Sequence, residues 1–416
     1  MLSVYQHWDP LKICAVGRSY GPEFYSFIEN PKVRSVMERI AIETEEDYQK
    51  LIKLLESFNV QVVRTDISQN REDHFYDGWR YYPPPMCPRD YTLMLGNTFF
   101  MPGLNYSSRW MINNHRVYTG LNLDYEIDLI LSRNEDNNEE ILNNLRKKIS
   151  KYNPVVQKDI LQKIKLMMRS INHDPLSTFP NNKIWDSFKS IRELVESHKN
   201  KIVEDTYANG ANIIRIGKDI YHGEITENEP EEYLLRNIKE VHSHVEDDYR
   251  IYALESATHS DGVFTPVKPG LIVSLQKMSK YKKTFPDWEV VELPNEGWEK
   301  VDPFLKLKHK NAGKWWVPGE ELNDDFTDFV ETWLKDWVLY VEETVFDVNM
   351  LVIDEKNVVC NNYNKKVFDA FERHGVTPHI VNFRHRYFWD GGLHCITSDL
   401  HREGAMQDYF PERSKK

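Results

Sequence analysis

The chain has 416 residues, long enough for one large domain or for two to three ordinary domains with a substantial core. Its hydrophobic fraction of 40% and charged fraction of 28% are those of a globular protein and exclude a wholly disordered chain. The 53 Lys and Arg against 65 Asp and Glu give a net charge of −12. A nucleic-acid binder needs a concentrated basic face, so we expect no nucleic-acid partner.

The cysteines and the apolar segments favour a reducing compartment. Cys14, Cys87, Cys360 and Cys395 are widely spaced and form no CxxC pair, so no metal site is expected. Cys14 and Cys360 lie in apolar strands and are expected in the core, whereas Cys87 receives no role. The sequence MLSVYQHWDPLK shows neither a signal peptide nor an Arg-rich presequence, and no apolar run approaches the ~20 residues of a membrane span. These features predict a soluble, cytoplasmic protein with reduced thiols and no membrane partner.

The first helix–strand unit is predicted over residues 44–65. Thr44 has the pattern of a capping box and is expected to start a helix, because apolar residues then recur at helical spacing. A strand of alternating valines follows Asn59.

From about residue 134 to residue 202 the chain is rich in Lys, Asn and Glu and carries helical patterns such as SFKSIRELVESHKN. We interpret this region as a mostly helical insertion or lid within a single domain that spans residues 1–416. A solvated outer layer with no part in the chemistry explains the same pattern at least as well.

Further helix–strand units follow this region. One begins at Glu229, a looser one begins at Leu271, and another begins at Asn364 with Gly375 as the helix stop. Recurring units of this kind indicate a repeated α/β architecture.

Four loop stretches beside predicted strands carry polar side chains. In the first, Arg89 and Asp90 precede an apolar strand, a pair that by itself is typical of a structural ion pair. In the second, the sequence NGAN (Asn209–Asn212) precedes a strand at 213–216 and by itself indicates a turn.

The third and fourth loops are ESATHSDGVFTP and FWDGGLHCITSDLHREG. If the third is extended, His259 and Asp261 project from one face toward the same ligand, although HxD alone is a weak signal. Cys395 by itself is either a reactive thiol or a small buried residue. His394 would point to the opposite side of an extended segment, and we interpret it as structural support and not as the base.

Taken together, these loops resemble those of the arginine:glycine amidinotransferases of the pentein, or guanidine-modifying, superfamily. The matching elements are Arg89-Asp90, His259-Ser-Asp261 and Cys395 within DGGLHCIT, in the family's order. YQHWDPLKICAVGRS, VNMLVIDEKNVV and LHREGAMQDYF also resemble family segments, so that the match covers nearly the whole chain. The resemblance implies one domain of five α/β modules around a pseudo-fivefold axis, with the site in the central channel.

The resemblance also implies a reaction. The family moves the amidino group of arginine to an amine acceptor, glycine in the name, and releases ornithine beside a product such as guanidinoacetate. A guanidinium is a poor electrophile, which calls for a strong nucleophile. Cys395 matches that nucleophile and would form an amidino-cysteine, and His259 matches the general acid and base. Asp90 and Asp261 match the carboxylates that hold the guanidinium. The resemblance implies small-molecule substrates and no cofactor or metal, and it is compatible with a homodimer.

Several positions depart from the family pattern. Asn209, one of the predicted catalytic residues, stands where the family has an acid, and its amide supplies no negative charge. If the loop is shifted, Asp205 would take the place of that acid. Lys277 stands near the family's carboxylate-binding arginine, as a point charge. Glu342 or Glu343, in YVEETVFD, lies in the family's serine-bearing substrate loop and favours an amine-rich substrate end. The remaining predicted substrate-binding residues are Arg89, Gly391 and Gly392, of which the two glycines would let the backbone turn tightly beside the thiol.

These departures leave one leading hypothesis and two alternatives. The leading one is a ping-pong amidinotransferase that uses arginine or a related guanidine as donor. The first alternative is a guanidine hydrolase of the same superfamily, a deiminase or dihydrolase, in which water resolves the intermediate. The second is a catalytically weakened binding protein, which the uncharged Asn209 suggests.

Overall fold

The fold consists of repeated small sheets. The computed structural model describes residues 1–67, 75–76, 80–81, 83–101, 147, 187–204, 209–223, 241–245, 248–253, 259–275, 281–293, 304, 306–307, 315–334, 337–338, 348–389 and 391–415. Within these ranges the strands form five three-stranded sheets, besides the pairing of β3 (Phe75–Tyr76) with β4 (Arg80–Tyr81). In each of the five sheets the first strand is antiparallel to the second, and the second is parallel to the third.

This shared topology confirms the expected α/β fold of five modules. A tight turn joins the antiparallel pair of strands in four modules, while the parallel third strand needs a crossover, which is usually a helix. In the order first, second and third strand, the modules are β17 (Thr397–Arg402), β1 (Leu11–Val16) and β2 (Gln61–Arg64); β5 (Leu93–Leu95), β6 (Thr98–Met101) and β7 (Lys201–Glu204); β8 (Ile213–Ile216), β9 (Asp219–His222) and β10 (Arg250–Ala253); β11 (Phe264–Lys268), β12 (Leu271–Ser274) and β13 (Glu289–Glu292); and β14 (Leu351–Asp354), β15 (Asn357–Cys360) and β16 (Thr377–Ile380).

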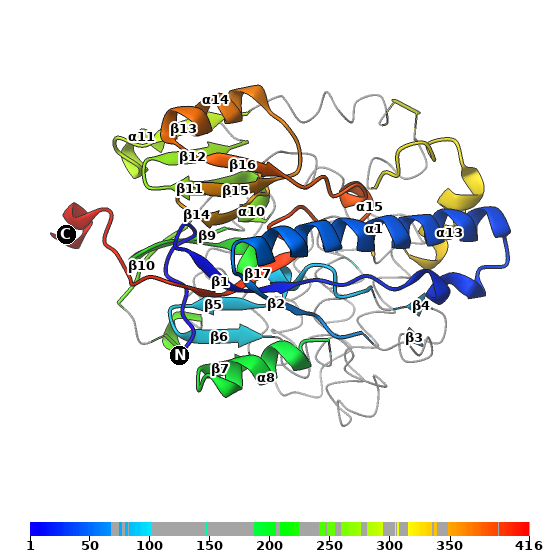
Figure 1. The fold of residues 1–416 in the computed structure, drawn as a ribbon, viewed down its shortest axis with the longest axis horizontal. Coiled ribbons are helices and arrows are strands. Elements are labelled where there is room, and N and C mark those ends of the chain that lie inside the picture. The colour runs from blue at the N-terminus through cyan, green and yellow to red at the C-terminus, as the bar shows by residue number, and fades with distance from the viewer. Residues whose placement is uncertain are drawn as a thin grey trace.

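One module combines both ends of the chain. β17, the last strand, pairs antiparallel with β1, the first strand, and Val16 lies opposite Thr397 (Figure 1). The backbone N–H of Gly17 also donates to the carbonyl of Ile396. The segment just before β17, which contains Cys395, is therefore held against the N-terminal strand.

Helices cross from the second to the third strand of a module. They are α1 (Pro31–Ser57), α8 (Lys189–Ser197), α11 (Tyr281–Thr284) and α14 (Lys365–His374), and residues 241–243 are helical in the β8–β10 module. α14 agrees with the prediction. Asn364 caps its N-terminus by accepting from the N–H of Val367, and Gly375 ends it at a left-handed φ of 65°. Outside this scheme lie α10 (Ser260–Val263), α13 (Asp324–Trp333), α15 (Arg386–Trp389) and the 3-10 helices η1 (Pro22–Phe27), η3 (Pro88–Asp90), η4 (Gly210–Asn212) and η6 (Pro411–Lys415).

The predicted helix start at Thr44 was wrong. α1 begins at Pro31, where the side chain of Asn30 accepts from two backbone N–H groups of the first turn. Thr44 lies in the middle of the helix, fully buried, and its hydroxyl accepts a 2.8 Å hydrogen bond from the indole of Trp389. A polar residue used for a tertiary contact had the local pattern of a cap.

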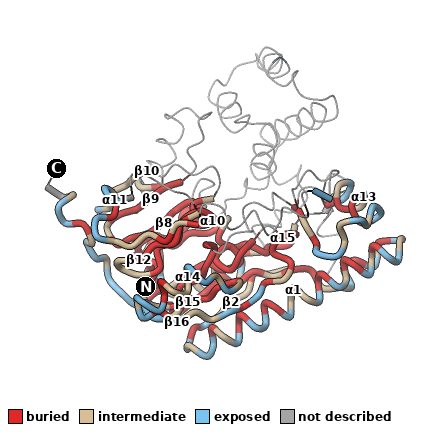
Figure 2. The backbone as a smooth tube through the Cα atoms, turned by 90° about the horizontal axis from the view of Figure 1, so that it is seen from above, coloured by how far each residue is buried: buried red, intermediate tan, exposed pale blue. Residues whose placement is uncertain are grey.

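The core lies between the helices and the small sheets. α1 buries Met37, Ile40 and Leu51 against Cys14 and Val16 of β1. Figure 2 shows the first and second strands of the modules mostly buried and the outer side of α1 exposed, and third strands such as β2 and β16 are partly exposed. Cys14 and Cys360 are 0% and 2% exposed, which confirms their place in the core.

Part of the predicted insertion belongs to a module. α8 and β7 begin within the range 134–202, and Phe188, Ile191 and Val195 are fully buried in the core cluster of the β5–β7 module. Apart from Lys147 and residues 187–202, the predicted insertion lies outside the described residues, and its helical character there stays a prediction.

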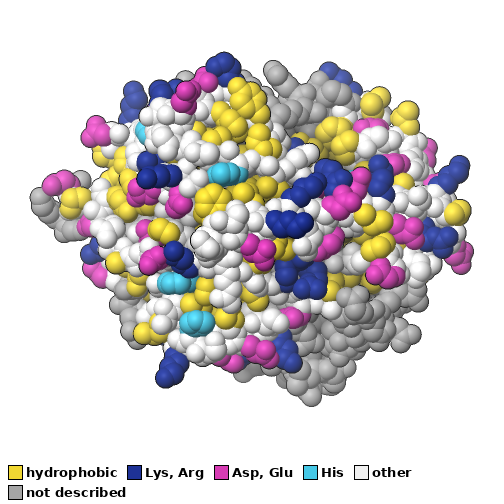
Figure 3. Space-filling model, viewed as in Figure 1, with side chains coloured by type: hydrophobic (Ala, Val, Ile, Leu, Met, Phe, Trp, Pro, Cys, Tyr) yellow, Lys and Arg dark blue, Asp and Glu magenta, His cyan; other side chains and the backbone are white. Residues whose placement is uncertain are grey.

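The described surface is mixed in charge. On the face shown in Figure 3, acidic and basic side chains alternate along α1, and Arg34 and Glu38 form one of its ion pairs. In the ranges that the structure describes, no helix has the length and apolar character needed to cross a membrane.

Candidate active site

Polar side chains precede the first strand of every module. The five segments are η3 before β5, η4 before β8, His259 with α10 before β11, residues 348–350 before β14, and residues 391–396 before β17. Because the modules repeat one topology, these segments occupy equivalent places in the five modules and can meet at one point.

Contacts between neighbouring segments show that they do meet. A Cβ on Gly210 would lie 2.9 Å from the carbonyl oxygen of Arg89, so this position requires glycine. Asn209 Nδ2 lies 3.4 Å from His259 Nε2, which joins the second segment to the third.

The remaining contacts join the third segment to the fourth, the fourth to the fifth and the fifth to the first, so that the five segments form a closed ring. Asn349 Nδ2 lies 3.4 Å from the carbonyl oxygen of Asp261 and 3.0 Å from Cys395 Sγ. The backbone N–H of Arg89 donates to the carbonyl of Cys395 at 3.3 Å. The predicted nucleophile, its base and its carboxylates therefore belong to one closed set of contacts.

Cys395 is a buried thiol in an acidic setting. It is 6% exposed, and its Sγ lies 3.5 Å from Asp261 Oδ2. Burial raises the pKa of the Cys395 thiol well above its usual range, and the charges of Asp261 and Asp90 raise it further. The hydrogen bond from Asn349 acts in the opposite direction. Without a bound cation, the sulfur is therefore protonated at neutral pH.

Asp261 is held by His394. Burial lowers the pKa of His394 to about 4, and the charge of Arg89 adds to this. The neutral imidazole donates from Nδ1 to Asp261 Oδ2 at 2.7 Å, which keeps the carboxylate ionised although burial opposes the charge. Among the described residues, no donor reaches Asp261 Oδ1, so this oxygen can accept from a ligand.

Neither of the two segments that were considered in an extended conformation is extended. His259 precedes the one-turn helix Ser260–Val263, so the HxD segment is not extended, although both side chains do reach the site. Residues 393–396 form a turn, and His394 therefore points toward Asp261 and not away from the nucleophile. Its interpretation as structural support agrees with this contact.

Asn209 presents its amide nitrogen to His259. Its Oδ1 accepts from the backbone N–H of Ala211 at 2.8 Å, which leaves Nδ2 as the group directed at His259 Nε2. A carboxylate at this position would instead accept from a protonated imidazole.

Arg89, expected at the substrate, lies beneath Cys395, the predicted nucleophile. Its Nε donates to the carbonyls of His394 and Thr397 at 3.3 and 3.0 Å, and its Nη1 donates to Asp399 at 2.5 Å. The side chain is 1% exposed, and these internal acceptors bind its Nε and Nη1. Arg89 supports the turn that carries Cys395.

The same carboxylate, Asp399, joins three modules. It accepts from Arg215 at 2.7 and 2.8 Å and from Arg402 at 2.8 Å, besides Arg89. The charges of Arg215, Arg89 and Arg402 hold the pKa of Asp399 well below its usual range against the effect of burial. Three buried cations and one anion thus lie below the site.

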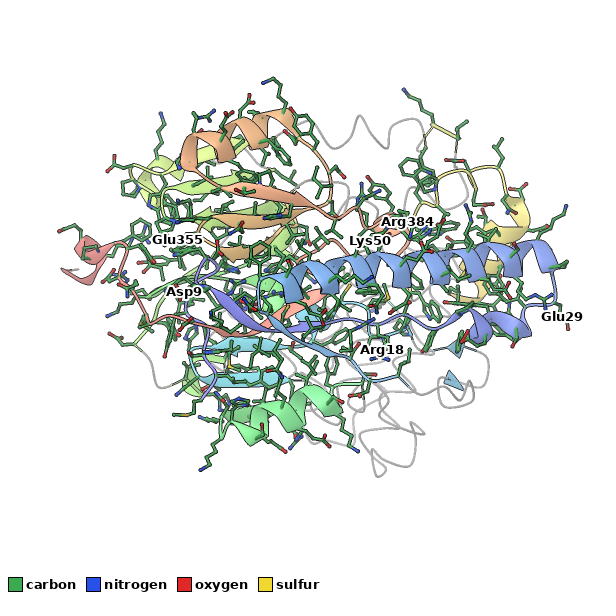
Figure 4. The ribbon with its side chains drawn as sticks, in the orientation of Figure 1. Asp9, Arg18, Glu29, Lys50, Glu355 and Arg384 are labelled. Carbon is green, nitrogen blue, oxygen red and sulfur yellow. The ribbon has the colours of Figure 1, made fainter. Side chains whose placement is uncertain are left out.

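Residues 393–396 carry the predicted nucleophile and are called the nucleophile turn. The segment before this turn is anchored on α1. Arg384 Nε donates to both oxygens of the fully buried Asp47, at 3.0 and 2.9 Å, and Trp389 donates to Thr44. Figure 4 shows Arg384 and Lys50 close together along this helix.

Gly391 and Gly392 are required for close approach and not for an unusual backbone angle. Neither has a positive φ. A Cβ on Gly391 would lie 2.6 Å from Cys87 Sγ, and one on Gly392 would lie 2.5 Å from Asn349 Oδ1. Cys87, to which no role was assigned, therefore lies beside the nucleophile turn.

Sequence reasoning missed Asn349 and Asp399. Asn349 stands just before the first strand of its module, as Asp90 and Asp261 do in theirs. Placing all five modules in register would have identified it. Asp399 lies within a strand, and no local pattern distinguishes it.

Two predicted substrate-binding residues, Lys277 and Glu342, lie outside the described residues, as does Asp205.

No group of three or more His, Cys, Asp or Glu side chains in the described ranges is arranged to hold a metal ion. A cavity of about 700 Å³ lies between the loop after β1 and α1, with Arg18, Tyr20 and Lys53 among its lining residues, and none of the predicted site residues lines it (Figure 4 labels Arg18).

Comparison with known sequences identifies amidinotransferases. No family model matches the chain. Glycine amidinotransferase, mitochondrial, from Gallus gallus is 24% identical over 240 residues, which cover 55% of this chain and 48% of that protein. L-arginine:L-lysine amidinotransferase from Pseudomonas savastanoi pv. phaseolicola is 24% identical over 245 residues, which cover 54% of this chain and 57% of that protein. The chain thus matches about half the length of these relatives.

Comparison with solved structures extends the likeness to the whole fold. SxtG, an amidinotransferase from Microseira wollei in the saxitoxin biosynthetic pathway, has a TM-score of 0.55 at 16% identity, covering 98% of this chain and 99% of that one. Inosamine-phosphate amidinotransferase StrB1 from Streptomyces griseus has a TM-score of 0.53 at 17% identity, with the same coverage. The chain therefore has the five-module fold of these amidinotransferases, and the resemblance to amidinotransferases first seen in its loops is confirmed.

Proposed function

We propose that this chain is an amidinotransferase that moves the amidino group of arginine, or of a related guanidine, to an amine acceptor. The observation that carries the proposal is a buried thiol 3.5 Å from the carboxylate of Asp261, with Asp90 charged nearby. Two anions beside a nucleophile, the buried Asp261 and the half-buried Asp90, suit a planar cation whose carbon is to be attacked. Guanidines are cations of this shape.

Substrate binding would activate the nucleophile. The guanidinium offsets the negative charges of Asp90 and Asp261, which otherwise raise the pKa of the Cys395 thiol. Asp261 Oδ1 accepts one N–H of the guanidinium and orients its carbon toward the sulfur, within the ~3–3.5 Å of a near-attack geometry. The thiol is thus ionised mainly when its substrate is present.

The reaction then proceeds in two halves. The Cys395 thiol gives its proton to His259, and the thiolate attacks the guanidinium carbon. The bond from that carbon to the δ-nitrogen of ornithine breaks as His259 passes the proton to the departing amine. The acceptor amine then gives a proton to His259 and attacks the amidino-cysteine. The carbon–sulfur bond breaks, the product leaves, and the proton on His259 returns to the sulfur.

The acceptor in the proposed reaction is an amine. The names of similar proteins include glycine, lysine and inosamine-phosphate amidinotransferases. Asn209 and Glu342 differ from the family pattern in the region that sets specificity, so glycine, with guanidinoacetate as product, is one candidate among several amines. The cytoplasmic location and a homodimer stay predictions, and sedimentation of the purified chain tests the latter.

One experiment tests the reaction. The purified chain is incubated with arginine, with and without a panel of amines that includes glycine and lysine, and products are identified by mass spectrometry. Ornithine together with an amidinated amine supports transfer, whereas citrulline formed without acceptor means hydrolysis. Absence of turnover and of an added amidine mass on Cys395 would refute both enzymatic functions.

A further inference from the structure

Asn349 lies closer to the sulfur of Cys395 than Asp261 does, at 3.0 Å against 3.5 Å. It precedes β14, is 1% exposed, and its Nδ2 lies 3.0 Å from Cys395 Sγ. Its Oδ1 accepts from the backbone N–H groups of His394 and Cys395 at 2.8 and 3.1 Å. One amide therefore binds both the sulfur and the backbone that carries it.

The orientation of this amide follows from its partners. Two backbone N–H groups point at one end of the side chain, and only the carbonyl oxygen can accept from them. The NH₂ group must then face Cys395 Sγ and the carbonyl oxygen of Asp261. Asn349 is thus a donor to the sulfur.

We propose that Asn349 is a catalytic residue, whose amide donates to the Cys395 sulfur and stabilises the thiolate that attacks the guanidine. This role rests on the proposed function for its place in a reaction, but its effect on the sulfur can be measured separately. Nothing in the sequence motifs assigned a role to this residue.

The charge around the sulfur makes such a donor effective. The thiol itself can donate to Asp261 Oδ2 at 3.5 Å, and in the described part of the chain Asn349 supplies the hydrogen bond that the sulfur accepts. A hydrogen bond to an anion is roughly twice as strong as one between neutral groups. The contact therefore stabilises the thiolate more than the thiol, which favours ionisation and attack.

Gly392 provides the space for this contact. A Cβ at Gly392 would lie 2.5 Å from Oδ1 and 2.7 Å from both Cβ and Cγ of Asn349. Any larger residue would displace the amide from the turn. The second glycine of the motif thus serves the hydrogen bonds of Asn349.

The variant Asn349→Asp separates the two functions of the amide. A carboxylate of nearly the same shape still accepts from the N–H groups of His394 and Cys395, and these donors keep it ionised. It presents an oxygen to the sulfur in place of the NH₂ group. The turn is retained, while the donor to the thiolate is lost and a negative charge is added.

The measurement is the rate of alkylation of Cys395 by iodoacetamide in the full-length, arginine-free protein. Peptide mass spectrometry distinguishes this thiol from the other three cysteines. Only the thiolate reacts, so between about pH 7 and pH 9, below the thiol pKa, the rate reports the ionised fraction. We expect Asn349→Asp to slow alkylation by about tenfold or more at each pH. In transfer assays we expect kcat to fall while KM for arginine stays similar or decreases.

Asn200→Asp is the matched control. Asn200 is also buried and its Oδ1 also accepts from the backbone, from the N–H of Leu2, but its Nδ2 donates only to backbone carbonyls, those of Leu2 and Asn97. This control should leave the alkylation rate unchanged. If Asn349→Asp does not fold, as judged by circular dichroism, Asn349→Ala carries the test, since it also removes the donor.

An alkylation rate in the folded Asn349 variant equal to or above that of the unmodified chain would overturn the proposal. Equal slowing by Asn200→Asp would also overturn it, because the effect would then come from general loosening. The alkylation result does not depend on turnover. If slowing occurs but no guanidine is processed, the action of Asn349 on the sulfur stands and the proposed function fails.

Discussion

Asp399 is the described position at which we expect a single substitution to lower the free energy of unfolding most. Among the described residues, Asp399 is the carboxylate that forms ion pairs with Arg89, Arg215 and Arg402, and all four side chains are 0–1% exposed. In Asp399→Asn the three cations lose their counter-charge, and the new NH₂ group donates toward groups that are themselves donors. Removing one partner of a buried ion pair costs about 3–5 kcal/mol. We expect at least that loss in the free energy of unfolding.

Urea unfolding followed by circular dichroism measures this loss. Urea is preferred to guanidinium chloride because guanidinium resembles the proposed substrate and also screens charges. The control is Glu196→Gln, which breaks an ion pair with Arg192 whose side chains are 25% and 51% exposed, and which should cost less than about 1 kcal/mol. A loss below about 1 kcal/mol in Asp399→Asn would show that this cluster does not hold the modules together.

Four further outcomes are expected. Asp90→Asn removes an anion that raises the pKa of the Cys395 thiol, so alkylation at neutral pH should become faster while transfer falls; slower alkylation would contradict the electrostatic account. Asn209→Asp should change the KM for arginine more than the thermal midpoint, and identical kinetics would show that this position does not matter. Gly375→Ala should lower stability by about 1 kcal/mol without altering turnover, because φ is 65° there, and an unchanged melting curve would argue against this strain. The folded-state pKa of Asp399 lies below its unfolded value of about 3.9. The contribution of Asp399 to the free energy of unfolding is therefore complete above that pH and is lost as the pH falls below it. Acid unfolding of Asp399→Asn should depend less on pH in this range.

The site explains why a thiol with a raised pKa can still serve as a nucleophile. Burial and two carboxylates keep Cys395 protonated in the absence of a cation, which protects it from reaction with other electrophiles. Under the proposed function, the same carboxylates select a cationic substrate, and binding of that substrate reverses their effect on the sulfur. In this account substrate recognition and activation of the nucleophile are one electrostatic event.

Local sequence patterns determined several elements of the fold. The strand at Ile213–Ile216 and the helix from Asn364 to Gly375 were predicted with their boundaries, because periodicity, an N-cap and a left-handed glycine act over a few residues. The order of the loops that carry Asp90, His259 and Cys395 was sufficient to indicate the family fold. The strand and the helix depend on neighbours in the chain, and the order of the loops is visible in the sequence. All three can be read without knowledge of packing.

Other features depended on tertiary contacts. Thr44 has the pattern of a helix cap, yet it accepts from Trp389, which lies 345 residues later in the chain. Arg89 stands beside a catalytic-site residue in sequence, but buried acceptors bind its Nε and Nη1 below the site.

By itself, the sequence determined the residue types of the site, the repeated helix–strand units and the family resemblance. Only the tertiary structure decided which polar groups face the sulfur. Asn349 and His394 come from different modules, and their hydrogen bonds to the nucleophile turn and to Asp261 exist only because five segments distant in sequence meet at the centre of one ring. Local propensity governs each element, whereas long-range packing sets the distances between side chains on which the chemistry depends.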